Sequence, residues 1–587
     1  MSEKKFIENI FTDSEYSLFQ AGIARFKEGD FNYRELNLTD IHDVSSLSPH
    51  SESSSNLIFS TDDVLSTGPR NELLSGLGIS SGVSNDHTVS RGNNPNGSAI
   101  ANASANATAI GIDNAGIIAT KKGRDIIFGI GLASVTSVAG AESEGIFSSS
   151  ATASARAIAS AVGLKNSGTI EAGDDSDAIF GFANVVASSE AKAEAQLTTG
   201  NDVAVTATSE SGAFVETSAI GIENLGRLLT GKGHDLIVGG ANSWSSSFSA
   251  AEAFAANTAA LLTNQHPPTV ALIEEVFASS TANSEALTQS LTIGIANSDL
   301  IHTTFGHDII IGLALSSSPS KAIADAETEA TAQNIATAQA EATSLAITES
   351  IAVGIVNLGK ISTGNGNDVV LGIAVNEAIA DADAHADADA NAEMPDSDTD
   401  TDTIADTFNS FDIGIDNTSG IIKTDIGNDQ VVGHGAVGIQ GGLIFTGKQH
   451  DRVIAYGSTV GFQDGTVRLG RGNDYFQAAI ANFVLYTDDL TFAEEQSGAI
   501  KDALITGGDG NDTFEIGGFS SRVVIDGGSG HDVFRLWSSI DDYQITLGSA
   551  ANQELIIRGE EGVLRVKQVE ELYFGDRNHA FSYSDFA

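Results

Sequence analysis

The chain has 587 residues, of which only 6% are aromatic and 62 are glycine, so one large conventional hydrophobic core is excluded and a repetitive fold with a thin interior is favoured. A formal net charge of −49 argues against nucleic acid and anionic membranes as partners. Cysteine is absent, which excludes disulfides, thiolate metal sites and cysteine nucleophiles.

The first 98 residues carry no clear strand pattern. We interpret residues 1–40 as a short helical N-terminal segment, because residues 21–31 (AGIARFKEGDF) are similar to the end of the first helix of a tetratricopeptide repeat. One half-repeat cannot bury its own face, so an amphipathic leader or cap is favoured over a tetratricopeptide repeat. Residues 41–98 are rich in Ser, Asn, Asp and Gly and are interpreted as a linker. The N-terminus lacks an apolar h-region and no long apolar run occurs anywhere, so we expect neither a cleaved signal peptide nor membrane insertion.

A large repeat begins near residue 99. Its clearest copies are residues 109–129, 219–239 and 352–372, the second of which reads AIGIENLGRLLTGKGHDLIVG. Each copy has the pattern strand, tight turn with Asn or Gly, strand, Gly-rich turn ending in Asp, strand, which is one coil of a β-solenoid. We therefore predict an all-β fold: a parallel β-solenoid over residues 99–435, continued by compact β-roll-like repeats over residues 436–537.

One aspartate closes each Gly-rich turn, and the spacing of these aspartates measures the coils. They are Asp125, Asp177, Asp235, Asp308, Asp368, Asp429, Asp451, Asp474, Asp512 and Asp532. Successive gaps are 52, 58, 73, 60, 61, 22, 23, 38 and 20 residues. The gaps near 20 residues equal one coil, and the longest gaps equal a coil plus an insertion.

The insertions carry alanine at every second position, at 99–109, 151–161, 322–342 and 378–392. Alanine is the best helix former, which favours helix, but a strict period of two places all the alanines on one face of a strand. We favour strands and keep helix as the alternative. Each insertion is then predicted to be a β-hairpin, and the stacked hairpins are predicted to form broad sheets with packed Ala/Gly faces. The acidic residues 381–406 are interpreted as a solvated tip, with weak divalent-ion binding as the alternative.

Two near-perfect nonapeptides stand at 507–515 and 527–535. Both fit G-G-x-G-x-D-x-U-x, the pattern of a calcium-binding parallel β-helix. Glycine lets the backbone curl so that carbonyl oxygens face inward, and Ca²⁺ takes about six to eight oxygen ligands. The spacing of one coil predicts that the two turns stack with an ion between them. On these motifs the chain resembles the repeats-in-toxin, or hemolysin-type calcium-binding, family.

The resemblance implies three further features. Residues 538–587 are similar to the capping segment that follows hemolysin-type repeats, and the final FSYSDFA is a candidate part of an export signal. The family commonly leaves the cell by type I secretion without a cleaved N-terminal signal. We therefore expect a secreted protein, either extracellular or on a bacterial cell surface.

The predicted calcium ligands lie in five turns. The strongest pair comprises Gly507, Asp509, Gly510 and Asp512 with Gly527, Ser529, Gly530 and Asp532; the weaker candidates are Gly470, Gly472 and Asp474, Gly364, Asn365, Gly366 and Asp368, and Gly231, Gly233 and Asp235.

The remaining turns depart from the motif. The turns at 172–177 and 446–451 lack the second glycine, and Lys122, Lys232, Lys448 and Arg471 occupy a position where a basic side chain would weaken the ion or replace it by pairing with the aspartate. His234, His307, His450 and His531 each precede the turn aspartate. That slot also takes Asn and Arg, so an exposed turn residue is favoured over a transition-metal site.

No catalytic signature accompanies the repeats. Residues 78–82 match the G-x-S-x-G string of serine hydrolases, but they lie in a Ser/Gly-rich tract where chance explains the match. We therefore predict a protein that is not an enzyme: a secreted calcium-binding structural or adhesive surface protein that folds on calcium and self-associates into a sheet, fibre or matrix, with cell-surface polysaccharide as a further candidate partner. The alternative is a toxin or hydrolase of the same family with an unrecognised active segment. Ice binding by a flat solenoid face would require Thr ladders, which are not evident.

Overall fold

The structure is a computed structural model that describes residues 32–33, 42–45, 50–56, 64–66, 71–91, 95–200, 204–258, 275–332, 335–392, 394–407, 410–484, 489–492, 498–575 and 580–586. The helical segment predicted for residues 1–40 lies outside the described residues, apart from the short strand β1 (Asn32–Tyr33). Among the described residues no helix is long and apolar enough to cross a membrane.

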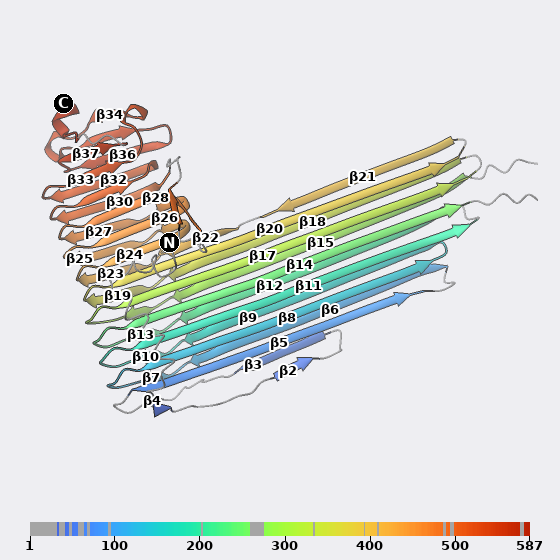
Figure 1. The fold of residues 1–587 in the computed structure, drawn as a ribbon, viewed down its shortest axis with the longest axis horizontal. Coiled ribbons are helices and arrows are strands. Elements are labelled where there is room, and N and C mark those ends of the chain that lie inside the picture. The colour runs from blue at the N-terminus through green and yellow to red at the C-terminus, as the bar shows by residue number, and fades with distance from the viewer. Residues whose placement is uncertain are drawn as a thin grey trace, which may run out of the picture.

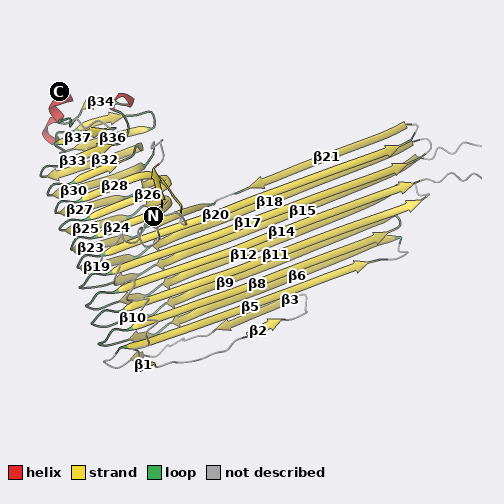
Figure 2. Ribbon diagram, viewed as in Figure 1, coloured by secondary structure: helices red, strands yellow, loops and turns green. Residues whose placement is uncertain are grey.

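The chain winds into a parallel β-solenoid, as predicted (Figure 1). One coil consists of a long outward strand, a long return strand and a short closing strand, for example β8 (Ile126–Gly145), β9 (Ser148–Asn166) and β10 (Thr169–Glu171). Each strand pairs in parallel with its counterpart in the next coil. We call the double layer of long strands the blade and the three-sided part that contains the short strands the base. Figure 2 shows that strands make up nearly all of both.

The remaining strands of the long coils repeat this pattern. The outward strands are β5 (Glu72–Ser90), β11 (Ala178–Gly200), β14 (Leu236–Thr258), β17 (Ile309–Thr331) and β20 (Val369–Asn391); the return strands are β6 (Asn96–Asn114), β12 (Ala204–Asn224), β15 (Glu275–Asn297), β18 (Ile335–Asn357) and β21 (Met394–Asp406) with β22 (Phe411–Asp416); the closing strands are β4 (Val64–Ser66), β7 (Ile117–Ala119), β13 (Arg227–Leu229), β16 (Leu300–His302), β19 (Lys360–Asn365) and β23 (Ile421–Ile426).

The strand register confirms the coil spacing read from the aspartates. Ile126 of β8 lies beside Ala178 of β11, and Ala178 lies beside Leu236 of β14. Each of these residues directly follows a corner aspartate, so the number of residues per coil equals the gap between successive aspartates. A 23-residue strand extends about 75 Å at roughly 3.3 Å per residue, so the blade projects far from the base.

The alternating alanines point into the blade. Ala101, Ala153 and Ala193, from three consecutive coils, are at most 2% exposed and belong to one apolar cluster. The insertions are therefore strands, and the helical alternative is wrong.

The predicted β-hairpin, however, must be corrected to an arch. β8 and β9 do not pair with each other: each bonds to the neighbouring coils, and the two legs face each other through their side chains. A hairpin would place both legs in one sheet and leave its alanine face bare. The arch covers the alanine faces and pairs the backbone between coils.

Part of the predicted linker is a full coil of the solenoid. β5 pairs residue by residue with β8 from Leu73 to Ser90, and β2 (His42–Ser45) and β3 (His50–Asn56) pair with β5 and β6. Its inward positions are glycine and serine, such as Gly78, Ser80 and Ser84, instead of alanine. The solenoid therefore begins well before residue 99.

Stacked isoleucines and asparagines hold the base together. Ile112, Ile118 and Ile127 come from the three sides of one coil and are at most 1% exposed. At the tight turn, the buried Asn114 amide donates to Asn166 at 2.7 Å, and the same bond continues coil by coil to Asn417. Buried amides satisfied in this way fix the register of the coils.

The C-terminal coils lack the blade and stack only on the base (Figure 1). Their strands are β24 (Gln430–Gln440), β25 (Leu443–Lys448), β26 (Arg452–Gln463), β27 (Thr466–Arg471), β28 (Tyr475–Val484), β30 (Ile500–Asp509), β31 (Thr513–Ile516), β32 (Phe519–Ser529) and β33 (Val533–Leu536), with β29 (Asp489–Phe492) antiparallel to β28. Phenylalanines such as Phe476, Phe514 and Phe534 fill their core.

The segment predicted to be a C-terminal cap lies on the last compact coil. β36 (Gly562–Lys567) and β37 (Glu571–Phe574) continue the solenoid on β32 and β33, and β34 (Gln544–Leu547) and β35 (Leu555–Arg558) add antiparallel strands. The 3₁₀ turns η1 (Ile540–Asp542), η2 (Ala550–Asn552) and η3 (Tyr583–Phe586) join or follow these strands.

Candidate metal centre

The six-residue turn that joins each closing strand to the next outward strand forms one corner of the base. Its aspartates stack in a column in which each backbone N–H donates to Oδ1 of the aspartate in the next coil at 2.8–2.9 Å. The column runs through Asp125, Asp177, Asp235, Asp308, Asp368, Asp429, Asp451, Asp474, Asp512 and Asp532. Its last rung is the N–H of Asp532 donating to Glu570 of the cap at 2.7 Å.

The second carboxylate oxygen is left without a partner. Oδ2 is buried and makes no hydrogen bond in Asp177, Asp235, Asp308, Asp368, Asp429, Asp451, Asp474, Asp512 and Asp532. Burial is the main cause that raises the pKa of Asp512 to about 7 and that of Asp532 to about 6. A buried carboxylate oxygen without a partner is unfavourable, so a proton or a cation is needed to stabilise it.

In the two corners that begin with Gly-Gly, the first glycine makes room for this oxygen. A Cβ at Gly507 would lie 2.2 Å from Oδ2 of Asp512, and a Cβ at Gly527 would lie 2.5 Å from Oδ2 of Asp532. Gly510 and Gly530 adopt φ of +142° and +147°, as the predicted curled turn requires. The oxygen atoms of these corners are of the kind that Ca²⁺ prefers, and the two Oδ2 atoms and backbone carbonyls are the candidate ligands.

Most other corners begin with threonine. These buried residues are Thr120, Thr230, Thr303, Thr363, Thr424 and Thr446. The Thr303 hydroxyl donates to the carbonyl of Thr363 at 2.6 Å, and Thr446 donates to the carbonyl of Leu469 at 2.7 Å. Burial is the main cause that raises the pKa of Asp235 to about 6. Here a buried side chain stands at the position that is glycine in the Gly-Gly corners, and the Thr303 and Thr446 hydroxyls bond to backbone carbonyls that an ion would need.

The weaker predicted sites differ from the strong pair at this first position. The corners containing Gly231, Gly233 and Asp235, and Gly364, Asn365, Gly366 and Asp368, begin with Thr230 and Thr363. The corner containing Gly470, Gly472 and Asp474 begins with Leu469, which is fully buried. Each has the expected positive-φ glycine and column aspartate, but a side chain occupies the space that is open beside Gly507.

No family model, curated protein or solved structure matches this chain. The case for calcium therefore depends on the nonapeptides and on the corner geometry.

The third residue of the six-residue corner, counted from its first glycine or threonine, points its side chain outward. Asp509 is 66% exposed and pairs with Arg471 at 3.3 Å, so it contributes only its backbone to the corner, where its carbonyl accepts from Gly472. The Ser529 carbonyl likewise accepts from Gly510 at 2.8 Å. Arg471 pairs with Asp509 and not with Asp474, and Lys122, Lys232 and Lys448 are exposed. The prediction that these basic residues lie beside the ion is corrected, because the third side chain leaves the turn.

The histidines before the aspartates form a second column that the sequence did not reveal. The N–H of His307 donates to Nδ1 of His234 at 2.7 Å, and the N–H of Asn367 donates to Nδ1 of His307 at 2.7 Å. Asn428, Asn473 and Asn511 accept in the same way in other coils. Apart from Arg124, the residue at this place therefore carries a side-chain acceptor, and the recurrence of His, Asn and Ser there was the signal in the sequence.

Hydrogen bonding and ring stacking engage the histidines of the second column. The rings of His234 and His307 stack at 4.9 Å, and each uses Nδ1 as a hydrogen-bond acceptor. Among the described residues no three His, Asp or Glu side chains gather as a metal-binding group. An ion between the Gly-Gly corners would therefore take most of its oxygens from the backbone.

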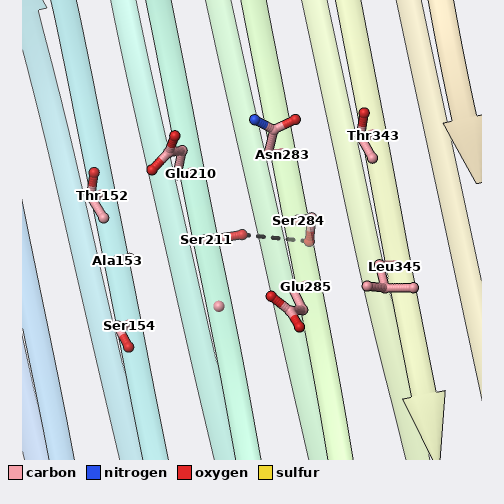
Figure 3. A pocket seen from close by; sticks show the side chains of 11 residues that line it. Thr152, Ala153, Ser154, Glu210, Ser211, Asn283, Ser284, Glu285, Thr343 and Leu345 are labelled. Atoms are coloured by element: carbon pink, nitrogen blue, oxygen red, sulfur yellow. Dashed lines mark hydrogen bonds between the residues drawn. The ribbon is translucent and has the colours of Figure 1, made fainter.

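The blade contains one shallow groove and the hydrolase-like string. The groove crosses the return strands β9, β12, β15 and β18, and it exists because Gly212 places no side chain between Ser154 and Glu285 (Figure 3). Residues 78–82 lie inside β5, where Ser80 points into the blade and is 1% exposed. A serine in mid-strand does not have the exposed strand-to-helix turn that a hydrolase nucleophile needs.

Proposed function

We propose that this protein is a secreted structural or adhesive protein whose C-terminal coils bind calcium between the corners at 507–512 and 527–532. The observation that carries the proposal is the position of Asp512 Oδ2, which is buried, without a partner, and turned into the space left by Gly507. The same arrangement recurs one coil later at Asp532 and Gly527. Two such corners in register are what a bridging divalent ion requires.

Calcium would supply positive charge to two carboxylates that burial disfavours in their ionised form. The side chains of Asp512 and Asp532 would hold it, while the first and second glycines let the backbone approach. The site lies between the last two compact coils and next to the cap, since Asp532 also bonds to Glu570. Binding there would stabilise the end of the solenoid.

The blade supports a structural role. Its long strands pair along their whole length from coil to coil and are filled by small side chains, which makes a thin, stiff plate. Export by type I secretion, an extracellular or surface location, and association with surface polysaccharide belong to the same proposal, and family resemblance is their support.

Calcium titration of matched variants tests the proposal. Asp512→Asn and Asp532→Asn keep an oxygen for the rung of the column but remove the charge. We expect calcium near a hundred times Kd to stabilise the wild type by about 2.7 kcal/mol per site, and the double variant to lose this gain. The control is Asp308→Asn, in a threonine corner, which should keep it. An unfolding midpoint that is the same in chelator and in calcium would refute the proposal.

A further inference from the structure

The blade ends at an unpaired edge. β20 pairs with β17 along its whole length, but the compact coils cover it only from Val369 to Ile373, where it meets β24. β21 pairs with β18 and with no other described strand. Residues 374–391 and 394–406 therefore form the upper border of the blade, with the compact coils over the base alone (Figure 1). Such an edge is a template for another strand.

The opposite border is treated differently. There β1 and β2 pair with β5, and β3 pairs with β6. Among the described residues, short strands of the chain thus cover part of one border of the blade and none covers residues 374–391 or 394–406 of the other.

The inward positions of this edge continue the small-residue face of the inner coils, with serine and threonine in place of alanine on β21. Ser397, Thr399 and Thr401 of β21 stand in register with Ala338, Ala340 and Ala342 of β18. Across the layer, Ala384, Ala386, Ala388 and Ala390 of β20 pack on the alanine cluster but are only partly buried. A further coil of the same kind would bury them completely, so the surface that best matches this edge is another copy of it.

The compact coils restrict the arrangements in which the blades of two copies can pair. They stand on the base beside Val369–Ile373 and obstruct a head-to-tail stack of whole blades. A twofold arrangement avoids them: β20 lies antiparallel to β20 of the second copy, β21 lies antiparallel to the second β21, and each compact part lies beyond the other's blade tip. This contact is isologous and closes as a dimer.

Negative charge on this edge makes the contact between two copies depend on cations. The outward side chains of the edge are acidic: Asp381, Asp383, Asp387 and Asp389 on β20, and Asp396, Asp398, Asp400 and Asp402 on β21. Of the four aspartates on β20, Asp381 has an ion-pair partner among the described residues, Lys321 at 2.8 Å. Opposed like charges destabilise a strand pair, so two such edges repel unless cations lie between them.

We propose that the edge of β20 and β21 is a self-association surface, on which a second copy of this chain pairs antiparallel once divalent cations neutralise the aspartate rows. This inference deepens the proposed structural function and rests on it, because it specifies the surface through which the protein would assemble. It does not depend on the ion at the Gly-Gly corners.

The absence of cysteine allows a direct test with the full chain. Asp383 lies near the centre of the free stretch of β20, so the twofold arrangement brings residue 383 of one copy close to residue 383 of the other. We expect Asp383→Cys to form disulfide-linked dimers in calcium and not in chelator. The matched control is Glu252→Cys, which lies on the same outer face in acidic surroundings but on β14, inside the blade. Equal cross-linking of both variants would overturn the proposal.

Light scattering separates this surface from the calcium corner. The wild type should be dimeric in millimolar calcium and monomeric in chelator. A variant with asparagine in place of all eight aspartates of the two rows (Asp381, Asp383, Asp387, Asp389, Asp396, Asp398, Asp400 and Asp402) should dimerise without divalent cations. The Asp512→Asn/Asp532→Asn variant should still dimerise in calcium although it loses stabilisation by calcium, so failure of the corner site and failure of the edge give different results. A wild type that stays monomeric in calcium at high protein concentration would refute the edge proposal.

Discussion

The backbone N–H of Asp512 donates to Oδ1 of Asp532 at 2.8 Å, while Oδ2 of both side chains is buried without a partner. Each carboxylate therefore has two distinct oxygens, one that holds the coils in register and one that is available. The same rung recurs along the corner column from Asp125. The first residue of each corner determines where this oxygen can lie: in the Gly-Gly corners the carboxylate turns into the place that a Cβ would take, and in the threonine corners a side chain fills that place.

Substitution of Gly507 tests the role of that space. Gly507→Ala places a methyl group 2.2 Å from Oδ2 of Asp512, so the carboxylate must move. We expect calcium affinity, measured by titration calorimetry, to fall at least tenfold, which is about 1.4 kcal/mol. Gly212→Ala is the control, since a Cβ there meets nothing within 4 Å. Unchanged affinity in Gly507→Ala would show that the ion does not use this corner.

The coil spacing could be predicted because the corner aspartates repeat at every coil, and a buried column of carboxylates tolerates little change. The blade strands could be predicted because alanine at every second position distinguishes strand from helix. The arch could not be predicted, since side chains alternate with a period of two residues in both an arch and a hairpin. The two differ only in which strands pair. β5 was missed because Gly and Ser fill its inner positions in place of alanine. The role of the first corner residue was also missed. Thr230 has a side chain that Gly507 lacks, and only the three-dimensional structure places that side chain beside the corner aspartate.

The corner column predicts an unusual pH dependence for the metal-free protein. Burial is the main cause that raises the pKa of Asp308 and of Asp429 to about 8. A carboxyl group with a raised pKa binds its proton more tightly in the folded chain than in the unfolded chain. Its contribution is fully present below the unfolded pKa, near 3.8, and is lost as the pH rises through about 8.

In chelator, the unfolding temperature should therefore be higher at pH 5.5 than at pH 8.5, by several degrees. Asp308→Asn cannot ionise and keeps an acceptor for the N–H of Asp235, so it should reduce this difference. The Glu210→Gln variant, on the exposed face of the blade, should leave the difference unchanged. A wild type that becomes more stable between pH 5.5 and 8.5 would contradict the assignment of buried, protonated aspartates.

The second column predicts which side chains can replace His307. Its Nδ1 accepts the N–H of Asn367 at 2.7 Å. Asparagine accepts the same bond elsewhere in the column, as Asn428 does from His450 at 3.0 Å. We therefore expect His307→Asn to leave the free energy of unfolding nearly unchanged. His307→Ala removes the acceptor and should lower that free energy by about 1 kcal/mol, the usual worth of one hydrogen bond. Denaturant unfolding at neutral pH measures both. Equal losses in the two variants would show that ring stacking on His234, and not the hydrogen bond, is what the slot selects.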